Sequence, residues 1–150
     1  MTLLELIHTI ESIASNQPSI KMVVENDVFR LNDRADAKYG VFAFVQGQHS
    51  SSIESNWINY TFTFFYVDRL KNDKSNQIEI QSVGIQTLDN IIRALDENGI
   101  YSNLTYTFQV FNQRFLDECA GVFCNVTLSV PPGSLCPEDF QNINADTIIY

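Results

Sequence analysis

The sequence lacks the strong motifs of most enzyme classes. It contains no G-x-S-x-G nucleophile elbow, no P-loop, no G-x-G-x-x-G fingerprint and no H-E-x-x-H zinc motif. It also lacks internal repeats, low-complexity tracts and any run approaching the roughly 20 apolar residues needed to span a bilayer. No basic leader or small-residue cleavage site precedes the first helical pattern, so we expect no signal peptide. From the missing apolar run we expect no membrane segment, and from the missing motifs no cofactor and no enzyme activity.

Basic residues are few. The chain carries 9 Lys and Arg residues against 18 Asp and Glu residues, for a net charge of −9. An acidic surface repels a phosphate backbone, and it releases no counterions that would drive binding to nucleic acid. We therefore expect no sequence-specific nucleic-acid binding through a basic patch.

Cysteine is also scarce, with Cys119, Cys124 and Cys136 as its only occurrences. An odd count without a secretory signal indicates reduced thiols, and a C-x4-C pair without a nearby histidine does not match zinc-ligand spacing. We interpret the cysteines as buried structural residues and expect no metal. The N-x-S/T triplets, expected to be chance matches, begin at Asn59, Asn103 and Asn125.

Two histidines could in principle pair with a cysteine nucleophile. His8 lies opposite much of the apolar stripe of the first helical pattern, and His49 lies in a serine-rich loop. We expect both to be solvated surface residues.

Two pairs of adjacent charged residues are also candidates for catalytic groups. Asp68 and Arg69 close a predicted strand, where a surface ion pair is the better interpretation. Asp117 and Glu118 point apart on either a strand or a helix, so they do not form a carboxylate dyad. No residue is assigned a catalytic, cofactor-binding or metal-binding role.

The remaining residues favour one globular α+β domain. A chain of 150 residues buries on the order of 70% of its unfolded surface, and a hydrophobic content of 45% with 11 Phe supplies the core. Residues 1–130 are predicted to form a mainly antiparallel sheet with a long hairpin, packed by two amphipathic helices in the order α-β-β-β-α-β-β. Residues 131–150 are predicted to form an extended arm, which docks on a neighbouring copy or folds over its own sheet.

Both helices are predicted from apolar periodicity. In the first, Thr2 and Glu5 form a capping box. The second spans 76–98, with Ser75 or Asn76 as its cap and Asn98-Gly99 as its left-handed end. The predicted apolar stripes are Leu3, Leu6, Ile7, Ile10, Ile13 and Ala14 in the first helix, and Ile78, Val83, Ile85, Leu88, Ile91, Ile92 and Leu95 in the second.

The strands are predicted from alternation and from aromatic content. Residues 20–31 form an extended run interrupted by turn-forming residues, and 39–48, apolar on both faces, indicate a central strand covered twice. The clearest strand is 57–70, with an aromatic even-numbered face, and the polar loop before it predicts a projecting hairpin. Two more strands are predicted at 101–111 and 122–130, joined by 112–121 as a short helical turn in preference to a β-bulged crossing.

This order of elements resembles the tail-terminator and tail-completion proteins of tailed bacteriophages. The resemblance lies in the capped helix Thr2 to Ser15, the strand pair Tyr39 to Leu70, the helix Asn76 to Asn98 and the strands that end at Val130. The segment Tyr60 to Asp68, before a loop and a helix, is similar to virion proteins of phages of Bacteroidetes, including crAss-like phages.

The resemblance implies a structural virion protein made in the host bacterial cytoplasm. In these proteins six or twelve copies join as a homo-oligomeric ring at the head-tail junction, between portal, connector or tail-tube proteins. The family pattern supplies no catalytic residues, and the arm 131–150 departs from its shortest members.

Two alternatives remain open. An NTF2-like domain would enclose a pocket lined by Tyr60, Phe62, Phe64 and Tyr106 and would act as a binding domain or an enzyme. A small adaptor would bind a partner protein by adding a strand to an exposed sheet edge.

Overall fold

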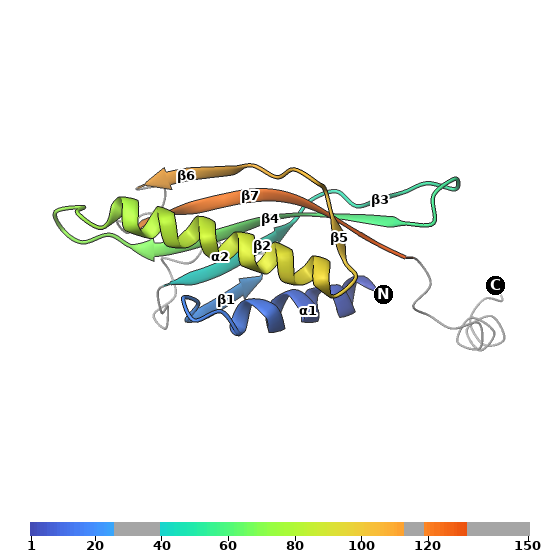
Figure 1. The fold of residues 1–150 in the computed structure, drawn as a ribbon, viewed down its shortest axis with the longest axis horizontal. Helices are drawn as coiled ribbons and strands as arrows, with labels where there is room; N and C mark the ends of the chain where they lie inside the picture. Colours follow the sequence, from blue (N-terminus) through green and yellow to red (C-terminus); the bar gives the residue numbers. More distant parts are fainter. Residues whose placement is uncertain (26–39, 113–118, 132–150) are drawn as a thin grey trace, which may run out of the picture.

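The computed structural model describes residues 1–25, 40–112 and 119–131, which form an α+β fold (Figure 1). Its elements in chain order are α1 Leu3–Ser15, β1 Met22–Glu25, β2 Val41–Gln46, β3 Ser50–Ser51, β4 Ile58–Arg69, α2 Gln77–Glu97, β5 Tyr101–Ser102, β6 Phe108–Asn112 and β7 Cys119–Val130. The seven strands within these ranges form one sheet in the order β1-β2-β4-β7-β5, with β3 added to β4 and β6 added to β7. The predicted fold class is confirmed, and the parallel pairing of β1 with β2 is a feature that the sequence did not indicate.

A long hairpin, as predicted, dominates the sheet. Strand β2 pairs with β4 from Val41↔Val67 to Gln46↔Phe62, and β3 continues the ladder toward the end of the hairpin. Strand β4 pairs with β7 along all 12 of its residues, a length of about 40 Å at the usual rise per residue. Residues 52–57, here called the hairpin tip, lie beyond the ends of both helices in Figure 1.

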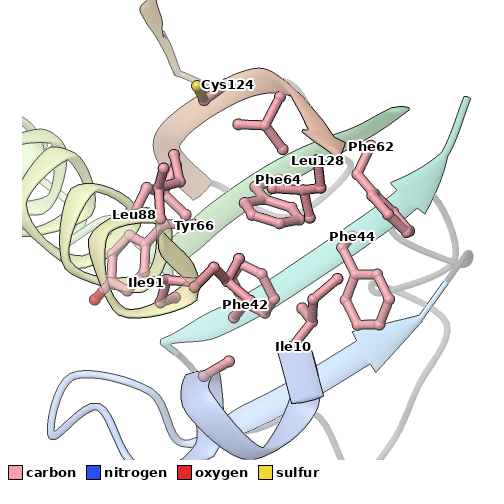
Figure 2. Close-up of a cluster of buried hydrophobic side chains, with 14 of the residues drawn as sticks. Ile10, Phe42, Phe44, Phe62, Phe64, Tyr66, Leu88, Ile91, Cys124 and Leu128 are labelled. Atoms are coloured by element: carbon pink, nitrogen blue, oxygen red, sulfur yellow. The ribbon is translucent and has the colours of Figure 1, made fainter. Parts of the chain in front are cut away.

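The main core fills the space between the even-numbered face of the sheet and the two helices. Alternate residues of β4 and β7 point to this face because side chains alternate along a strand. Figure 2 shows rings of β2 and β4 lying toward Ile10 of α1 and toward Leu88 and Ile91 of α2. The fully buried rings of this cluster are Phe42, Phe44, Phe62 and Phe64.

The odd-numbered face carries a second, smaller apolar cluster near the far end of the hairpin. Val41, Ala43 and Val67 are fully buried in it, and Phe65 packs against Phe123 with ring centroids 5.8 Å apart. Strand β2 therefore buries side chains on both faces, which confirms the prediction of a strand covered twice.

Helix α1 matches its sequence pattern closely. Glu5 N donates to Thr2 Oγ1 at 3.2 Å, and Thr2 N donates to the Glu5 carboxylate at 3.0 Å, so the predicted capping box is present. The residues of the stripe that are buried in the core are Leu6, Ile7, Ile10 and Ala14.

Helix α2 has the predicted position but a different rotation about its axis. Its buried stripe is Ile80, Gly84, Thr87, Leu88, Ile91, Ile92 and Leu95, and the predicted inward residues Ile78, Val83 and Ile85 are exposed. The reason lies at Gly84, where an added Cβ would come within 2.9 Å of side-chain atoms of both Tyr66 and Val122. A position without a side chain lets this turn of α2 lie directly on the sheet, so its larger neighbours face outward.

The start of α2 also corrects the prediction of a side-chain cap. Asn76 occupies the N-cap position, but its side chain makes no capping hydrogen bond. It closes the turn from β4 instead: Nδ2 donates to Arg69 O at 3.2 Å, and Oδ1 accepts from Lys71 N at 2.8 Å. The end of the helix is as predicted, with Gly99 at a φ of 82°.

The single strand predicted at 101–111 is wrong, because β5 and β6 are separate. Ser102 pairs with Leu128 and Phe108 with Cys124, so five residues, 103–107, lie opposite three residues of β7. Asn103 bridges this bulge, since its Oδ1 accepts from Thr127 N at 3.3 Å.

The predicted connection at 112–121 is partly corrected. Residues 119–121 belong to strand β7 and do not form a helical turn. Residues 113–118 lie outside the described part of the chain, as do the second half of the run 20–31 and the arm from residue 132 onward.

Candidate functional site

Of the residues considered as a possible Cys-His nucleophile pair, the described cysteines lie in the core. Cys119 and Cys124 are buried and free of disulfides, and burial raises the pKa of the Cys124 thiol to about 11, which keeps it protonated. His8 is exposed on α1, as predicted. Cys136 and the pair Asp117-Glu118 lie outside the described residues.

His49 is more organised than a solvated loop histidine. Its Nδ1 accepts from the backbone N–H of Thr61 at 3.2 Å, and its Nε2 lies 3.0 Å from Gln46 Oε1. The ring also packs edge-on against Tyr60, with centroids 5.1 Å apart. His49 thus ties the loop after β2 to β4 and helps to hold the hairpin.

The side chains proposed to line an NTF2-like pocket are part of the core. Phe62 and Phe64 are fully buried, and Tyr60 is nearly so, in one cluster with residues from both helices. Tyr106 is partly buried against the same cluster, and its hydroxyl donates to Asp89 Oδ1 of α2 at 2.6 Å. This packing argues against a pocket lined by the four aromatic residues.

A cleft lies where β4 turns into α2. It has a volume of about 370 Å³, and we call it the turn-end cleft. Its lining residues are Ser19, Lys21, Gly40, Tyr66, Asp68, Lys71, Asn76, Glu79, Ile80 and Val83. The cleft therefore combines two lysines, two carboxylates and apolar side chains of α2.

Tyr66 and Asp68 form the polar floor of this cleft. The Tyr66 hydroxyl donates to Asp68 Oδ2 at 3.4 Å, and Asp68 Oδ1 accepts from the backbone N–H of Arg69 at 2.7 Å. Burial, together with the negative charge of Asp68 and this hydrogen bond, raises the pKa of Tyr66 well above its usual range. Tyr66 is only 2% exposed, so its hydroxyl is a fixed hydrogen-bond donor at the floor of the cleft.

The charges of the described residues are distributed unevenly along the molecule. Within the described ranges, four of the five basic residues lie on or beside the turn-end cleft: Lys21, Arg69, Lys71 and Lys74. The fifth, Arg93, bonds to Asp89 with an Nε to Oδ2 distance of 2.7 Å. Three acidic residues share the cleft end, namely Asp68, Asp73 and Glu79.

The opposite end of the molecule is acidic. Helix α1 begins at this hairpin end, because the Met1 amino group lies 3.5 Å from Pro131 O, just after β7. Helix α2 ends at the same place, because β5 follows it and pairs with the last residues of β7. The acidic residues that this arrangement brings to the hairpin end are Glu5, Glu54, Asp96 and Glu97.

The hairpin tip presents apolar side chains on a defined turn. Ile53 is fully exposed and Trp57 is 38% exposed, although both are large hydrophobic residues. The backbone behind them is held locally, because Glu54 N donates to Ser52 Oγ at 3.3 Å and Trp57 N donates to Ser55 Oγ at 3.1 Å. Serine side chains of the predicted polar loop thus fix the turn that exposes Ile53.

Sequence reasoning identified the projecting hairpin but missed the cleft. The lysines of the cleft come from two separate loops, and only the parallel addition of β1 beside β2 brings Lys21 to the same end as Lys71. No short-range spacing could have signalled this arrangement. Among the residues that the structure describes, no three His, Cys, Asp or Glu side chains are grouped to hold a metal ion, and no helix is long and apolar enough to cross a membrane.

Comparison with known proteins adds no assignment. No model of a protein family matches the chain, and no curated protein has a sequence similar to it.

Proposed function

We propose that this chain is a structural virion protein that forms a homo-oligomeric ring at the head-tail junction of a tailed bacteriophage. Six or twelve copies join around the channel, and portal, connector or tail-tube proteins lie above and below them. The protein is made in the cytoplasm of the host bacterium and acts as a scaffold without catalytic chemistry. The resemblance of the order of elements predicted from the sequence to that of tail-terminator proteins supports this proposal.

The observation that carries the proposal is the hairpin tip. A long strand pair holds the hairpin tip beyond the helices (Figure 1), and Ile53 and Trp57 of this tip are both exposed. Large apolar side chains on a rigid projection typically anchor contacts between proteins. The even-numbered face, which would otherwise offer a ligand pocket, is filled by side chains of both helices.

The acidic surface is compatible with a ring around a DNA channel. A protein of net charge −9 does not attract the phosphates that pass through it, so the channel lining would not retain DNA. The adaptor alternative also has a surface to use, because within the described residues β6 pairs only with β7 and Val110 on it is exposed.

Measurement of mass in solution separates these functions. We expect light scattering across a concentration series to show a closed species of six or twelve copies, and negative-stain images to show rings. A monomer or dimer at every concentration would refute assembly by this chain alone and would favour the adaptor. Addition of a soluble peptide library would then test strand addition at β6.

A further inference from the structure

We infer that the hairpin tip of one copy docks in the turn-end cleft of the next copy, so that neighbouring subunits associate head to tail. The inference rests on the proposed function, because it names the contact that would build the ring. The occupant of the cleft is a second copy of this chain.

The two surfaces lie at opposite ends of the same strand. Strand β4 begins next to the hairpin tip and ends at Arg69 beside the cleft, about 40 Å away. Within one chain the tip therefore cannot reach the cleft. A contact between two unlike patches on separate copies is heterologous, and repetition of such a contact generates either a closed ring or an open filament.

Charge favours this pairing of ends over other pairings. At the cleft end the four basic residues outnumber the three acidic residues Asp68, Asp73 and Glu79, whereas the hairpin end carries Glu54 together with the acidic ends of α1 and α2. Tip-to-tip association would bring carboxylates together, and cleft-to-cleft association would bring lysines together. Only the head-to-tail arrangement places Glu54 near Lys21 and Lys71, where unlike charges attract.

Apolar side chains match as well. Val83 lines the cleft at its edge, and Ile78 on the preceding turn of α2 is 78% exposed although it is a large hydrophobic residue. A neighbouring copy docked at the cleft covers these apolar residues on the outward face of α2, which the sheet does not bury. A cleft of about 370 Å³ has room for roughly ten water molecules, which is enough to accept the side chain of Ile53 and release water from both surfaces.

A charge-reversal cycle tests the electrostatic part of the contact. We expect Glu54→Lys and Lys71→Glu to raise the concentration needed for assembly by about tenfold or more each, because each places like charges at the interface. The double variant should recover most of the loss. Glu11→Lys is the matched control, since it makes the same change of charge on α1, away from both surfaces, and should leave assembly nearly unchanged. Thermal unfolding of each variant monitors the fold.

Cross-linking between two different variants tests the geometry. Ile53→Cys protein is mixed with Val83→Cys protein, both carrying Cys136→Ser, and a short bismaleimide joins thiols across the contact. We expect a mixed dimer whose linked peptides contain positions 53 and 83. Leu104→Cys is the control partner for Val83→Cys, because Leu104 is fully exposed but lies in the bulge between β5 and β6; this pair should not cross-link.

The outcomes separate this contact from the proposed function. A wild-type ring with rescue by the double variant and with the 53–83 cross-link supports both. A wild-type ring that the single reversals do not weaken, or in which 104–83 links as well as 53–83, overturns the head-to-tail contact and leaves the ring intact. A wild-type chain that stays monomeric and gives no 53–83 link overturns both.

Discussion

Two isoleucines in the first turn of α2 test the rotation of this helix. Ile80 is 4% exposed and belongs to the main core, whereas Ile78 is 78% exposed on the outer face. The apolar periodicity of the sequence placed Ile78 inward and did not include Ile80 in the stripe. Replacing each by alanine therefore asks which of the two positions supports the fold.

The expected difference follows from burial alone, because the two substitutions are chemically identical. Ile80→Ala should lower the free energy of unfolding by about 2 to 4 kcal/mol, the usual loss when a buried isoleucine leaves a cavity. Ile78→Ala should change it by less than about 0.5 kcal/mol, since exposed substitutions have small effects. Alanine has the higher helix propensity in both cases, so that contribution cancels in the comparison.

Urea unfolding followed by circular dichroism measures both variants. Protein concentration is held equal and below the onset of assembly, because association stabilises the folded state by mass action. The midpoint for Ile80→Ala should fall strongly with an unchanged slope, and the midpoint for Ile78→Ala should stay near that of the wild type. Equal losses, or a larger loss for Ile78→Ala, would refute the position of α2 described above.

Two further predictions concern the sheet. Gly121→Ala should cost at least about 3 kcal/mol of stability, since the added Cβ would overlap the Tyr66 carbonyl oxygen of the paired strand and meet the ring of Phe111; expression of the folded variant at the wild-type level would contradict the close approach. Burial and a hydrogen bond to a carboxylate of α2 raise the pKa of Tyr106 to about 12. Its neutral form is thus favoured in the folded state, so this contribution to stability is complete below pH 10 and is lost as the pH rises from about 10 to about 12. Absorbance titration near 295 nm should show a tyrosine that ionises near pH 12 and that Tyr106→Phe removes, whereas Tyr66, whose pKa is also raised, still ionises late in that variant.

Local patterns predicted the elements that depend on local interactions. The capping box of α1 joins residues three positions apart, and the alternation of β4 sets its two faces wherever the strand lies in the sheet. The long hairpin follows from two strongly patterned strands on either side of a polar loop. These features needed no knowledge of the rest of the fold.

The features that sequence reasoning missed depend on distant contacts. The rotation of α2 is set by the fit of Gly84 against Tyr66, which comes from another part of the chain. The break between β5 and β6 depends on a hydrogen bond that the backbone N–H of Thr127 in β7 donates to Asn103 Oδ1. The turn-end cleft needs the parallel addition of β1, and nothing in a strand of four residues specifies its neighbour.

The negative net charge repels other copies of the chain, whereas the proposed contact attracts one. The two effects do not conflict, because they act over different distances. Charges are screened beyond about 8 Å at physiological ionic strength, far less than the length of about 40 Å that separates the ends of β4. Repulsion between whole copies is therefore weak, while a glutamate and a lysine in contact across an interface still attract each other. The acidic surface elsewhere opposes close approach by other faces. Among the described regions, the cleft end is then the one where the approach of an acidic hairpin is favoured. The excess of negative charge on the other faces therefore makes the hairpin tip more selective for the cleft.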